Sequence, residues 1–164
     1  MKKLTSIILG TVLFMATACA AGNEVDSTGS NTPETKGVLP MKLNIQIDNG
    51  TSKHTLTATL NDNSSSRALV ELLEKDSITI DMHDFSNFEK VGDLPVTLPR
   101  NDTPTDTDAG DLILYLGKRF VIYYDKNSWD FTALGKIDGI TKVELKKILG
   151  KGNVTAVLSI NTLD

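Results

Sequence analysis

The stretch FEKVGDLPVTLPR, from Phe88 to Arg100, restricts the fold more than any other part of the sequence. It begins with an aromatic residue and an adjacent acid–base pair, and then places Pro95 and Pro99 in a short apolar run. Proline has no backbone N–H donor, so it breaks helices and is confined to edges or irregular parts of sheets. The stretch is therefore predicted to end a strand and to continue as an extended loop at the rim of a β-domain, rather than to form a central strand.

Strands are predicted on both sides of this stretch. Their mark is an alternation of apolar and polar residues with a period of two, which is typical of a half-buried strand. The predicted strands cover residues 41–47, 54–60, 77–82, 111–116, 119–124 and 153–161. Two turn signals, Asp48-Asn49-Gly50 and the two-residue Gly117-Lys118, separate pairs of these runs and predict two hairpins.

Two short helices are predicted between the strands. The first, over about 65–75, follows the possible N-caps Asn61-Asp62-Asn63 and carries one apolar stripe. The second begins at the capping box Thr141-Lys142-Val143-Glu144 and ends at Gly150. Many short strands with two short helices predict a mainly β fold, a barrel or a sandwich with helices at its ends.

The N-terminus has the layout of a secretory signal. Met1-Lys2-Lys3 is basic, residues 4–18 are mostly apolar, and small residues precede Cys19, the only cysteine of the chain. The apolar run is shorter than the ~20 residues that a spanning helix needs, which disfavours a transmembrane anchor. This layout resembles the lipobox of bacterial lipoproteins, whose cysteine is acylated after cleavage.

The lipobox resemblance implies a signal peptide over residues 1–18 and a lipid on Cys19 that attaches the protein to a membrane of the bacterial cell envelope, with the domain outside the cytoplasm. Each buried methylene of a lipid chain contributes ~0.8 kcal/mol to anchoring. The alternative is cleavage after Ala18 or Ala20, which would release a soluble exported protein. Ala20-Ala21-Gly22 carries no sorting signal, so the inner and the outer membrane both stay open.

Composition divides the rest of the chain into a tether and one domain. Residues 19–40 are rich in Gly, Asn, Ser and Thr and cannot bury enough apolar surface to offset their ordering entropy, so they are predicted to be a flexible spacer. Residues 41–164 have a normal length for one domain with one core.

Charge and motif content exclude several classes of function. The formal charge of −4 becomes −6 when the two lysines of the signal are removed, and an acidic protein is a poor partner for nucleic acid. His54 and His83 lack the spacing of metal ligands, and no glycine-rich phosphate loop is present. No metal and no cofactor are therefore predicted.

A set of segments keeps one order and spacing across residues 41–160. They are Phe88-Glu89-Lys90-Val91-Gly92, Leu94-Pro95, Leu98-Pro99, Ala109-Gly110-Asp111-Leu112, Leu114-Tyr115, Val121-Ile122-Tyr123-Tyr124 and Leu134-Gly135-Lys136-Ile137. Together they resemble the bacterial cyclophilin-like domains, which are related in fold to the cyclophilin peptidyl-prolyl isomerases. The resemblance implies a closed β-barrel of about eight strands with two short capping helices.

The same resemblance implies a candidate ligand-binding groove. In cyclophilins a Phe-His-Arg segment lies on the substrate groove, and its arginine donates to the twisted amide. Here Phe88-Glu89-Lys90 takes that place, and the candidate groove consists of Phe88, Glu89, Lys90, Tyr124 and Trp129. Lysine lacks the rigid fork of a guanidinium. The groove is therefore predicted to bind a peptide or small molecule without isomerase turnover, and a weak prolyl isomerase acting on exported proteins is the alternative.

Simpler interpretations of these residues stay open. Glu89 and Lys90 could be a solvated pair at a strand end, worth under ~1 kcal/mol. Adjacent residues of a strand point to opposite faces, so Tyr123 and Tyr124 are expected to divide between core and rim. Trp129 is placed in a polar loop over 125–130, where it either plugs a barrel end or lines the groove. Residues 101–108 are predicted to be a second polar loop.

Overall fold

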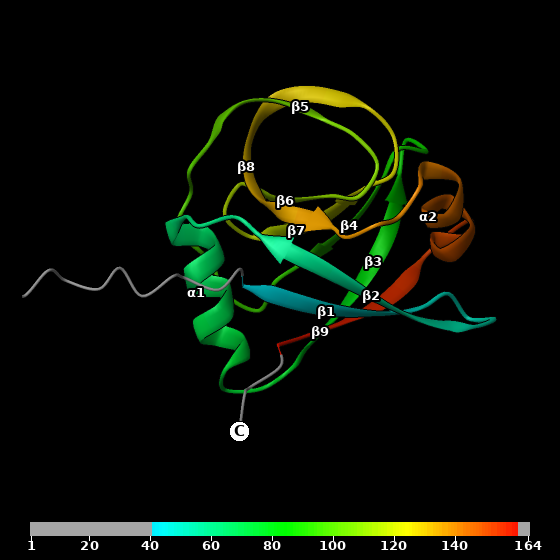
Figure 1. Cartoon of the computed structure of the whole chain (residues 1–164), viewed down its shortest axis with the longest axis horizontal. Helices are drawn as coiled ribbons and strands as arrows, with labels where there is room; N and C mark the ends of the chain where they lie inside the picture. The colour runs from blue at the N-terminus through cyan, green and yellow to red at the C-terminus, as the bar shows by residue number, and fades with distance from the viewer. Residues whose placement is uncertain (1–40, 161–164) are drawn as a thin grey trace, which may run out of the picture. The chain divides into compact units, whose positions relative to one another are not determined.

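The structure, a computed structural model, describes residues 41–160 (Figure 1). The predicted signal peptide 1–18, the predicted lipidation site Cys19 and the predicted tether over 19–40 lie outside the described residues. Within 41–160, none of the helices combines the length and the apolar character required to cross a bilayer.

The described residues form nine strands and two helices. The strands are β1 (Lys42–Asp48), β2 (Lys53–Leu60), β3 (Ile78–Phe85), β4 (Glu89–Asp93), β5 (Thr103–Thr107), β6 (Asp111–Tyr115), β7 (Arg119–Tyr123), β8 (Asn127–Ile137) and β9 (Val154–Ser159). Helix α1 (Ser64–Leu73) lies between β2 and β3, and α2 (Lys142–Leu149) lies between β8 and β9. The mainly β class, the six predicted strands and both predicted helices are confirmed.

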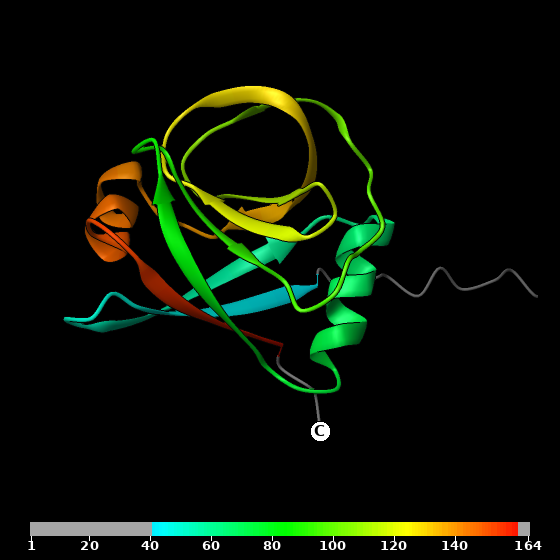
Figure 2. The ribbon, with the colours of Figure 1, turned by 180° about the vertical axis from the view of Figure 1, so that it is seen from behind.

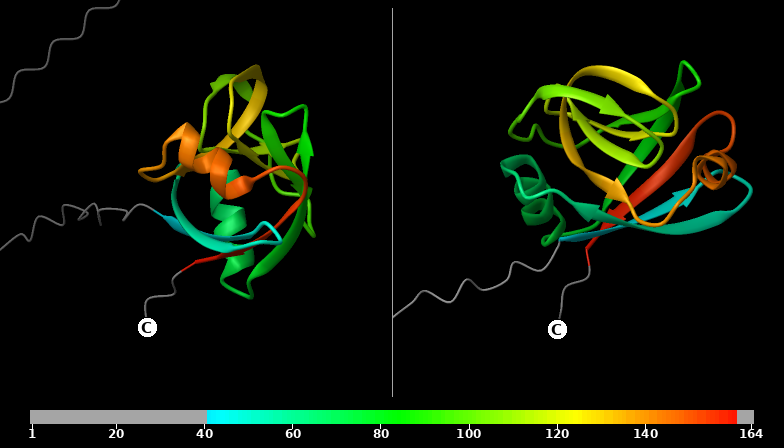
Figure 3. Two further views of the ribbon diagram at one scale, coloured as in Figure 1. Left: turned by 90° about the vertical axis from the view of Figure 1, so that its right-hand side faces the viewer. Right: turned by 45° about the horizontal axis from the view of Figure 1, so that its top comes forward.

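One antiparallel sheet contains all nine strands and closes on itself. The order of its strands is β2-β1-β9-β3-β4-β7-β6-β8-β5, and β2 also pairs with the end of β8. This closing contact places Ala58, Thr59 and Leu60 opposite Ile137, Lys136 and Gly135, respectively. Eight strands therefore form a ring, which confirms the predicted barrel, and α1 and α2 lie at its two ends (Figures 1 and 3).

The ninth strand, β5, pairs with the first half of β8 and lies outside the ring. Its register runs from Thr103 opposite Phe131 to Thr107 opposite Asn127. Here β8 curves away from the barrel, so β5 and β8 together form an arch (Figure 1), which Figure 2 shows from behind with β3 beside it. We call this feature the β5–β8 arch.

Two clusters of buried side chains lie on the two faces of this sheet. The main core fills the barrel and combines Phe120 and Ile122 of β7 with residues of β1, β2, β3, β6, β8 and β9 and of both helices. The second cluster lies on the outer face, under the β5–β8 arch, and consists of Val91, Ile113, Val121, Tyr123 and Phe131. Alternation along β7 explains the division, because Val121 and Tyr123 point away from the face that Phe120 and Ile122 occupy.

Local sequence signals explain how the elements begin and end. Asn63 caps α1 by accepting from the N–H of Ser66, and Thr141 with Glu144 forms the predicted capping box of α2. The turn predicted at Gly117-Lys118 is one residue longer, because Leu116 also lies between the paired Tyr115 and Arg119. Leu116 and Gly117 have positive φ angles of 52° and 73°.

The predictions of two polar loops are wrong. Residues 101–108 contain strand β5, and residues 127–130 begin strand β8. Both segments belong to the β5–β8 arch, where solvent reaches both faces of the strands. Their side chains therefore stay polar and show none of the apolar alternation by which strands are recognised.

The opening stretch divides into a strand and a loop. Strand β4 pairs with β3 on one side and β7 on the other, so this part is an internal strand and not the predicted strand end. From Leu94 to Asp102 the chain is irregular, as predicted, with Leu94 and Leu98 buried in the core.

Candidate functional site

A cavity of about 750 Å³ lies on the outer face of the barrel, over β3, β4 and β7 and beneath the β5–β8 arch. We call it the outer-face cavity. Strands β3, β4 and β7 form its floor, and Asn127, Trp129 and Phe131 of β8 form the wall that faces them. The curvature of β8 thus partly covers a sheet face that would otherwise be open to solvent.

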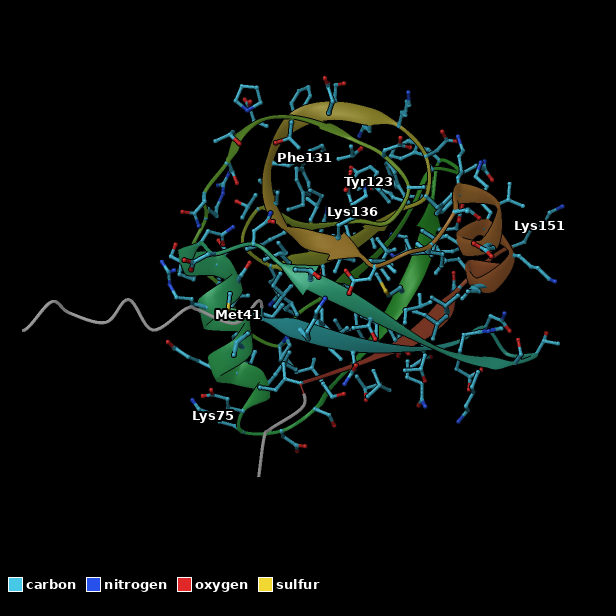
Figure 4. The ribbon with its side chains drawn as sticks, in the orientation of Figure 1. Met41, Lys75, Tyr123, Phe131, Lys136 and Lys151 are labelled. Atoms are coloured by element: carbon cyan, nitrogen blue, oxygen red, sulfur yellow. The ribbon has the colours of Figure 1, made fainter. Side chains whose placement is uncertain are left out.

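A continuous strip of aromatic rings lines the outer-face cavity. Phe88 stacks on Tyr123, with ring centroids 6.0 Å apart and planes at 11°. Phe131 contacts Tyr123 at 5.6 Å and Tyr115 at 6.1 Å, and Phe85 meets the edge of Phe88 at 5.9 Å. The side chains of Tyr123 and Phe131 lie within the arch in Figure 4. Such a wall offers a large apolar contact area to a ligand.

Glu89 places a carboxylate among these rings. It is half-buried, and the hydroxyl of Tyr123 donates a hydrogen bond to it. Burial raises the pKa of Glu89 above 4.5, although Tyr123, His83 and Arg119 act in the opposite direction. Asn127 Nδ2 donates to Tyr123 Oη at 3.2 Å, which fixes the phenol. Burial and the bond to Glu89 hold the pKa of Tyr123 far above its usual range, so the phenol stays protonated.

Arg119 contributes a guanidinium group to the lining of the outer-face cavity. Its side chain is 53 % exposed and lies 3.7 Å from Asp93 Oδ1. The guanidinium carbon is 6.0 Å from the centroid of the Tyr115 ring, which is a cation–π distance. Arg119 therefore lies at the rim, with two partners from the cavity wall.

Lys90 lies on the other face of β4 and is fully buried. Its ammonium donates to Asp84 Oδ1 at 2.7 Å, to the Gly152 carbonyl at 2.6 Å and to the Gly150 carbonyl at 3.3 Å. These three acceptors match the three protons of the ammonium group. The interpretation of Glu89 and Lys90 as a solvated pair is wrong, because alternation sends them to opposite faces of the sheet.

Tyr124 belongs to the same buried group as Lys90. Its hydroxyl donates to Asp84 Oδ1 at 2.6 Å, and the Lys90 ammonium lies 5.7 Å from the centroid of its ring. Burial raises the pKa of Asp84, but the bonds from Lys90 and Tyr124 outweigh it, and the net pKa is below 3.8. Since Gly150 ends α2, this cluster connects that end of the helix to β3 and β4.

The structure therefore separates the five candidate groove residues. Phe88, Glu89 and Trp129 line the outer-face cavity, whereas Lys90 and Tyr124 lie outside it. Trp129, 65 % exposed, lies on β8 at the cavity and plugs neither end of the barrel. The tyrosine pair divides between the two faces as expected, although both side chains are largely buried.

Sequence reasoning missed several lining residues, namely His83, Tyr115, Arg119, Tyr123 and Phe131. Alternation along β4 and β7 could have found Tyr123, because Glu89 and Tyr123 are directly paired in the two strands. Phe131 gave no such signal, since its position depends on the curvature of β8. Within residues 41–160, no three His, Cys, Asp or Glu side chains gather closely enough to hold a metal ion.

The ring of eight strands with a helix at each end defines a small closed-barrel domain. A model of the cyclophilin-like family matches residues 45–159, a range that extends from β1 to the end of β9. The chain therefore belongs to the cyclophilin-like family. No curated protein sequence matched it.

Proposed function

We propose that this protein is an exported, lipid-anchored binding module that holds a peptide or small molecule in its outer-face cavity. The observation that carries the proposal is the cavity itself. Its volume of about 750 Å³ falls within the ~300–1,000 Å³ of ligand pockets. Apolar and aromatic walls with a few placed polar groups, here Glu89, Tyr123 and Arg119, are typical of such pockets.

Binding without proline isomerisation is the form of this function that the position of Lys90 supports. Rotation about an amide bond crosses ~18–20 kcal/mol, and a catalyst needs a donor aimed at the twisted amide. Lys90 was the residue predicted to supply that donor. Its ammonium is sealed from solvent and bound to Asp84, Gly150 and Gly152, so it has no free proton to offer a substrate.

A weak prolyl isomerase is the second candidate, and the exposed guanidinium of Arg119 is the observation that favours it. A protease-coupled assay with a proline-containing peptide separates the two functions. We expect no acceleration above the uncatalysed rate. Acceleration that is lost in Arg119→Ala would replace the binding function by the enzymatic one.

The binding function can be tested by filling the outer-face cavity. Val91 is buried in the cavity floor, so Val91→Phe adds a ring where a ligand would lie. Trp129 is the only tryptophan, and its fluorescence reports on the cavity. We expect 2-phenylethanol to change this fluorescence saturably in the wild type and not in Val91→Phe.

The matched control is Val143→Phe, the same substitution at a position on α2 that is 78 % exposed and outside the cavity. It should respond as the wild type does. Thermal unfolding shows whether each variant is folded. A wild type without a saturable response, or an equal response in Val91→Phe, contradicts the proposed function.

A further inference from the structure

We propose that the outer-face cavity selects small organic ammonium ions over neutral or anionic molecules of the same shape, an inference that rests on the binding function proposed above. The feature that carries it is the juxtaposition of the Glu89 carboxylate with the aromatic strip. A carboxylate and electron-rich ring faces both attract a cation, and the two lie here in one cavity.

The charged groups of the cavity favour a positive ligand. Its lining contains three acids, Asp81, Glu89 and Asp93, and one permanent cation, Arg119. His83 also lines the cavity and is counted as neutral in the formal charge. The lining therefore carries a net charge of about −2, and an arriving cation reduces this charge whereas an anion increases it.

The single cation of the lining is already engaged. Arg119 lies 3.7 Å from Asp93 and over the ring of Tyr115, so an anionic ligand would have to compete with Asp93 for it. The contact with Tyr115 also shows that a ring of this cavity receives a cation at its face.

Glu89 has capacity for a ligand. Its carboxylate offers about four acceptor sites, and the one hydrogen-bond donor that residues 41–160 supply to it is the Tyr123 hydroxyl. Burial disfavours its charge, as the raised pKa of Glu89 shows, and an ammonium group bound beside it would compensate that charge. Phe88 and Tyr123 stack next to it and supply the faces for the methylene or methyl groups around the nitrogen.

The size of the cavity and its partial cover favour a small molecule as the source of the ammonium group. The β5–β8 arch covers the sheet face at Asn127, Trp129 and Phe131, and a volume of about 750 Å³ suits one compact ligand.

Three probes that share one ring and chain test the inference. They are 2-phenylethylammonium, neutral 2-phenylethanol and anionic 3-phenylpropanoate, with Kd measured by Trp129 fluorescence and calorimetry on the purified protein. We expect the ammonium ion to bind at least about tenfold more tightly than the alcohol, and the propanoate to bind most weakly.

Each other outcome overturns the inference in a recognisable way. Equal binding of the ammonium ion and the alcohol, or tightest binding of the propanoate, removes the cation preference and leaves the binding function intact. Absence of binding by all three removes both.

Two variants assign the preference to Glu89. Glu89→Gln keeps an acceptor for Tyr123 but loses the charge, so the ratio of the Kd values of alcohol and ammonium ion should fall to about one. Glu71→Gln removes an exposed charge on α1, outside the cavity, and should keep the wild-type ratio. A wild-type ratio in Glu89→Gln overturns the inference.

The pH dependence gives an independent check. The groups that face Glu89 are His83 on β3 and Tyr123 and Arg119 on β7. As the pH falls through the raised pKa of Glu89, the carboxylate is neutralised and the preference for the ammonium ion should disappear. His83 also faces Glu89, so the loss is measured in His83→Gln, which removes this second ionisable side chain. A preference that persists in this variant at pH 3.5 contradicts the inference.

Discussion

At the scale of single residues, Glu89 and Lys90 show how strand geometry assigns neighbouring charges to different tasks. Their backbones are consecutive in β4, but their side chains point to opposite faces of the sheet. Glu89 lies among aromatic rings in the outer-face cavity, and Lys90 is sealed inside with Asp84. Strand alternation predicts that the two side chains separate, yet nothing in the sequence decides which one faces the outer-face cavity.

The buried pair of Lys90 and Asp84 should contribute strongly to stability. Asp84→Ala leaves the Lys90 ammonium buried without its counter-charge, and breaking a buried pair costs ~3–5 kcal/mol. Asp84 keeps 22 % exposure, so we expect a loss of about 2–3 kcal/mol in urea unfolding. The control is Asp62→Ala, which removes an exposed pair with Arg67 and should cost under ~1 kcal/mol. Equal losses in the two variants would show that the buried ion pair contributes no more to the free energy of unfolding than the exposed pair does.

The same contacts give the contribution of Asp84 a defined pH range. Lys90 and Tyr124 hold the folded-state pKa of Asp84 below its ordinary 3.8. A carboxyl group with a lowered folded pKa stabilises the protein above its unfolded pKa, and this stability is lost as the pH falls through the folded value. The loss in Asp84→Ala should therefore be complete above about pH 4 and shrink at lower pH.

Glu89 should have the opposite effect on stability. Burial raises its pKa above 4.5 in the folded protein, so folding favours the neutral carboxylic acid and the ionised group destabilises at neutral pH. We expect Glu89→Gln to raise the free energy of unfolding at pH 7. The gain should diminish below pH 4.5, where the wild-type carboxyl is protonated in both states. Urea unfolding at pH 7 and pH 4 measures it, and a variant less stable than the wild type at pH 7 would contradict the assignment.

At the scale of elements, a strand or helix is easier to predict from the sequence when one of its faces is buried. Strands β1 and β9 and both helices pack against the main core, so their alternation, periodicity and caps identify them from the sequence. Strand β5 and the start of β8 are polar because the arch is solvated on both faces, and the sequence presents them as loops. Phe131 was missed because it lies on this arch, whereas Tyr123 lies on β7, where its pairing with Glu89 could have revealed it.

Gly135 allows β8 to close the barrel against β2. A Cβ at this position would lie 2.3 Å from the Thr59 carbonyl oxygen and 2.8 Å from Leu60 Cα, both atoms of the facing backbone. Backbone cannot rotate away as a side chain can, so Gly135→Ala should cost about 3 kcal/mol or more in urea unfolding.

Gly139→Ala is the control for this prediction. Its φ of 59° imposes strain on alanine, but an added Cβ would have no atom within 4 Å apart from those of its chain neighbours, so we expect a cost of about 1 kcal/mol. Equal costs at the two positions would show that the closing contact tolerates a methyl group.

At the scale of the whole molecule, the barrel and the membrane anchor are separate parts of the proposed function. Most strands carry one buried face, so their alternation predicted a mainly β domain. The order and spacing of segments across 41–160 resemble the cyclophilin-like pattern, and this resemblance predicted the closed barrel. The particular register of β8 against β2 and the curvature of the arch depend on contacts between residues far apart in the chain. These determine the outer-face cavity, so the site was predicted less completely than the fold.

The proposed anchor predicts where the protein is found in a bacterial cell. If Cys19 is acylated, the full chain should fractionate with membranes, and Cys19→Ser should prevent lipidation and move the domain out of the membrane fraction. The reason is that two or more lipid chains together anchor stably, whereas the tether that remains has little apolar surface. Mass spectrometry of the N-terminal peptide gives the modification directly.

The control for the anchor is Glu71→Gln, which leaves the N-terminus unchanged and should stay with the membranes. Wild-type chain in the soluble fraction, with an unmodified cysteine or a cut after Ala18 or Ala20, would replace the anchored module by a released one. We expect the cavity to bind in that case as well, because its lining residues begin at Asp81 and all lie more than 60 residues beyond Cys19. A soluble domain with an unchanged Kd for 2-phenylethylammonium would thus show that anchoring and recognition are independent properties of this chain.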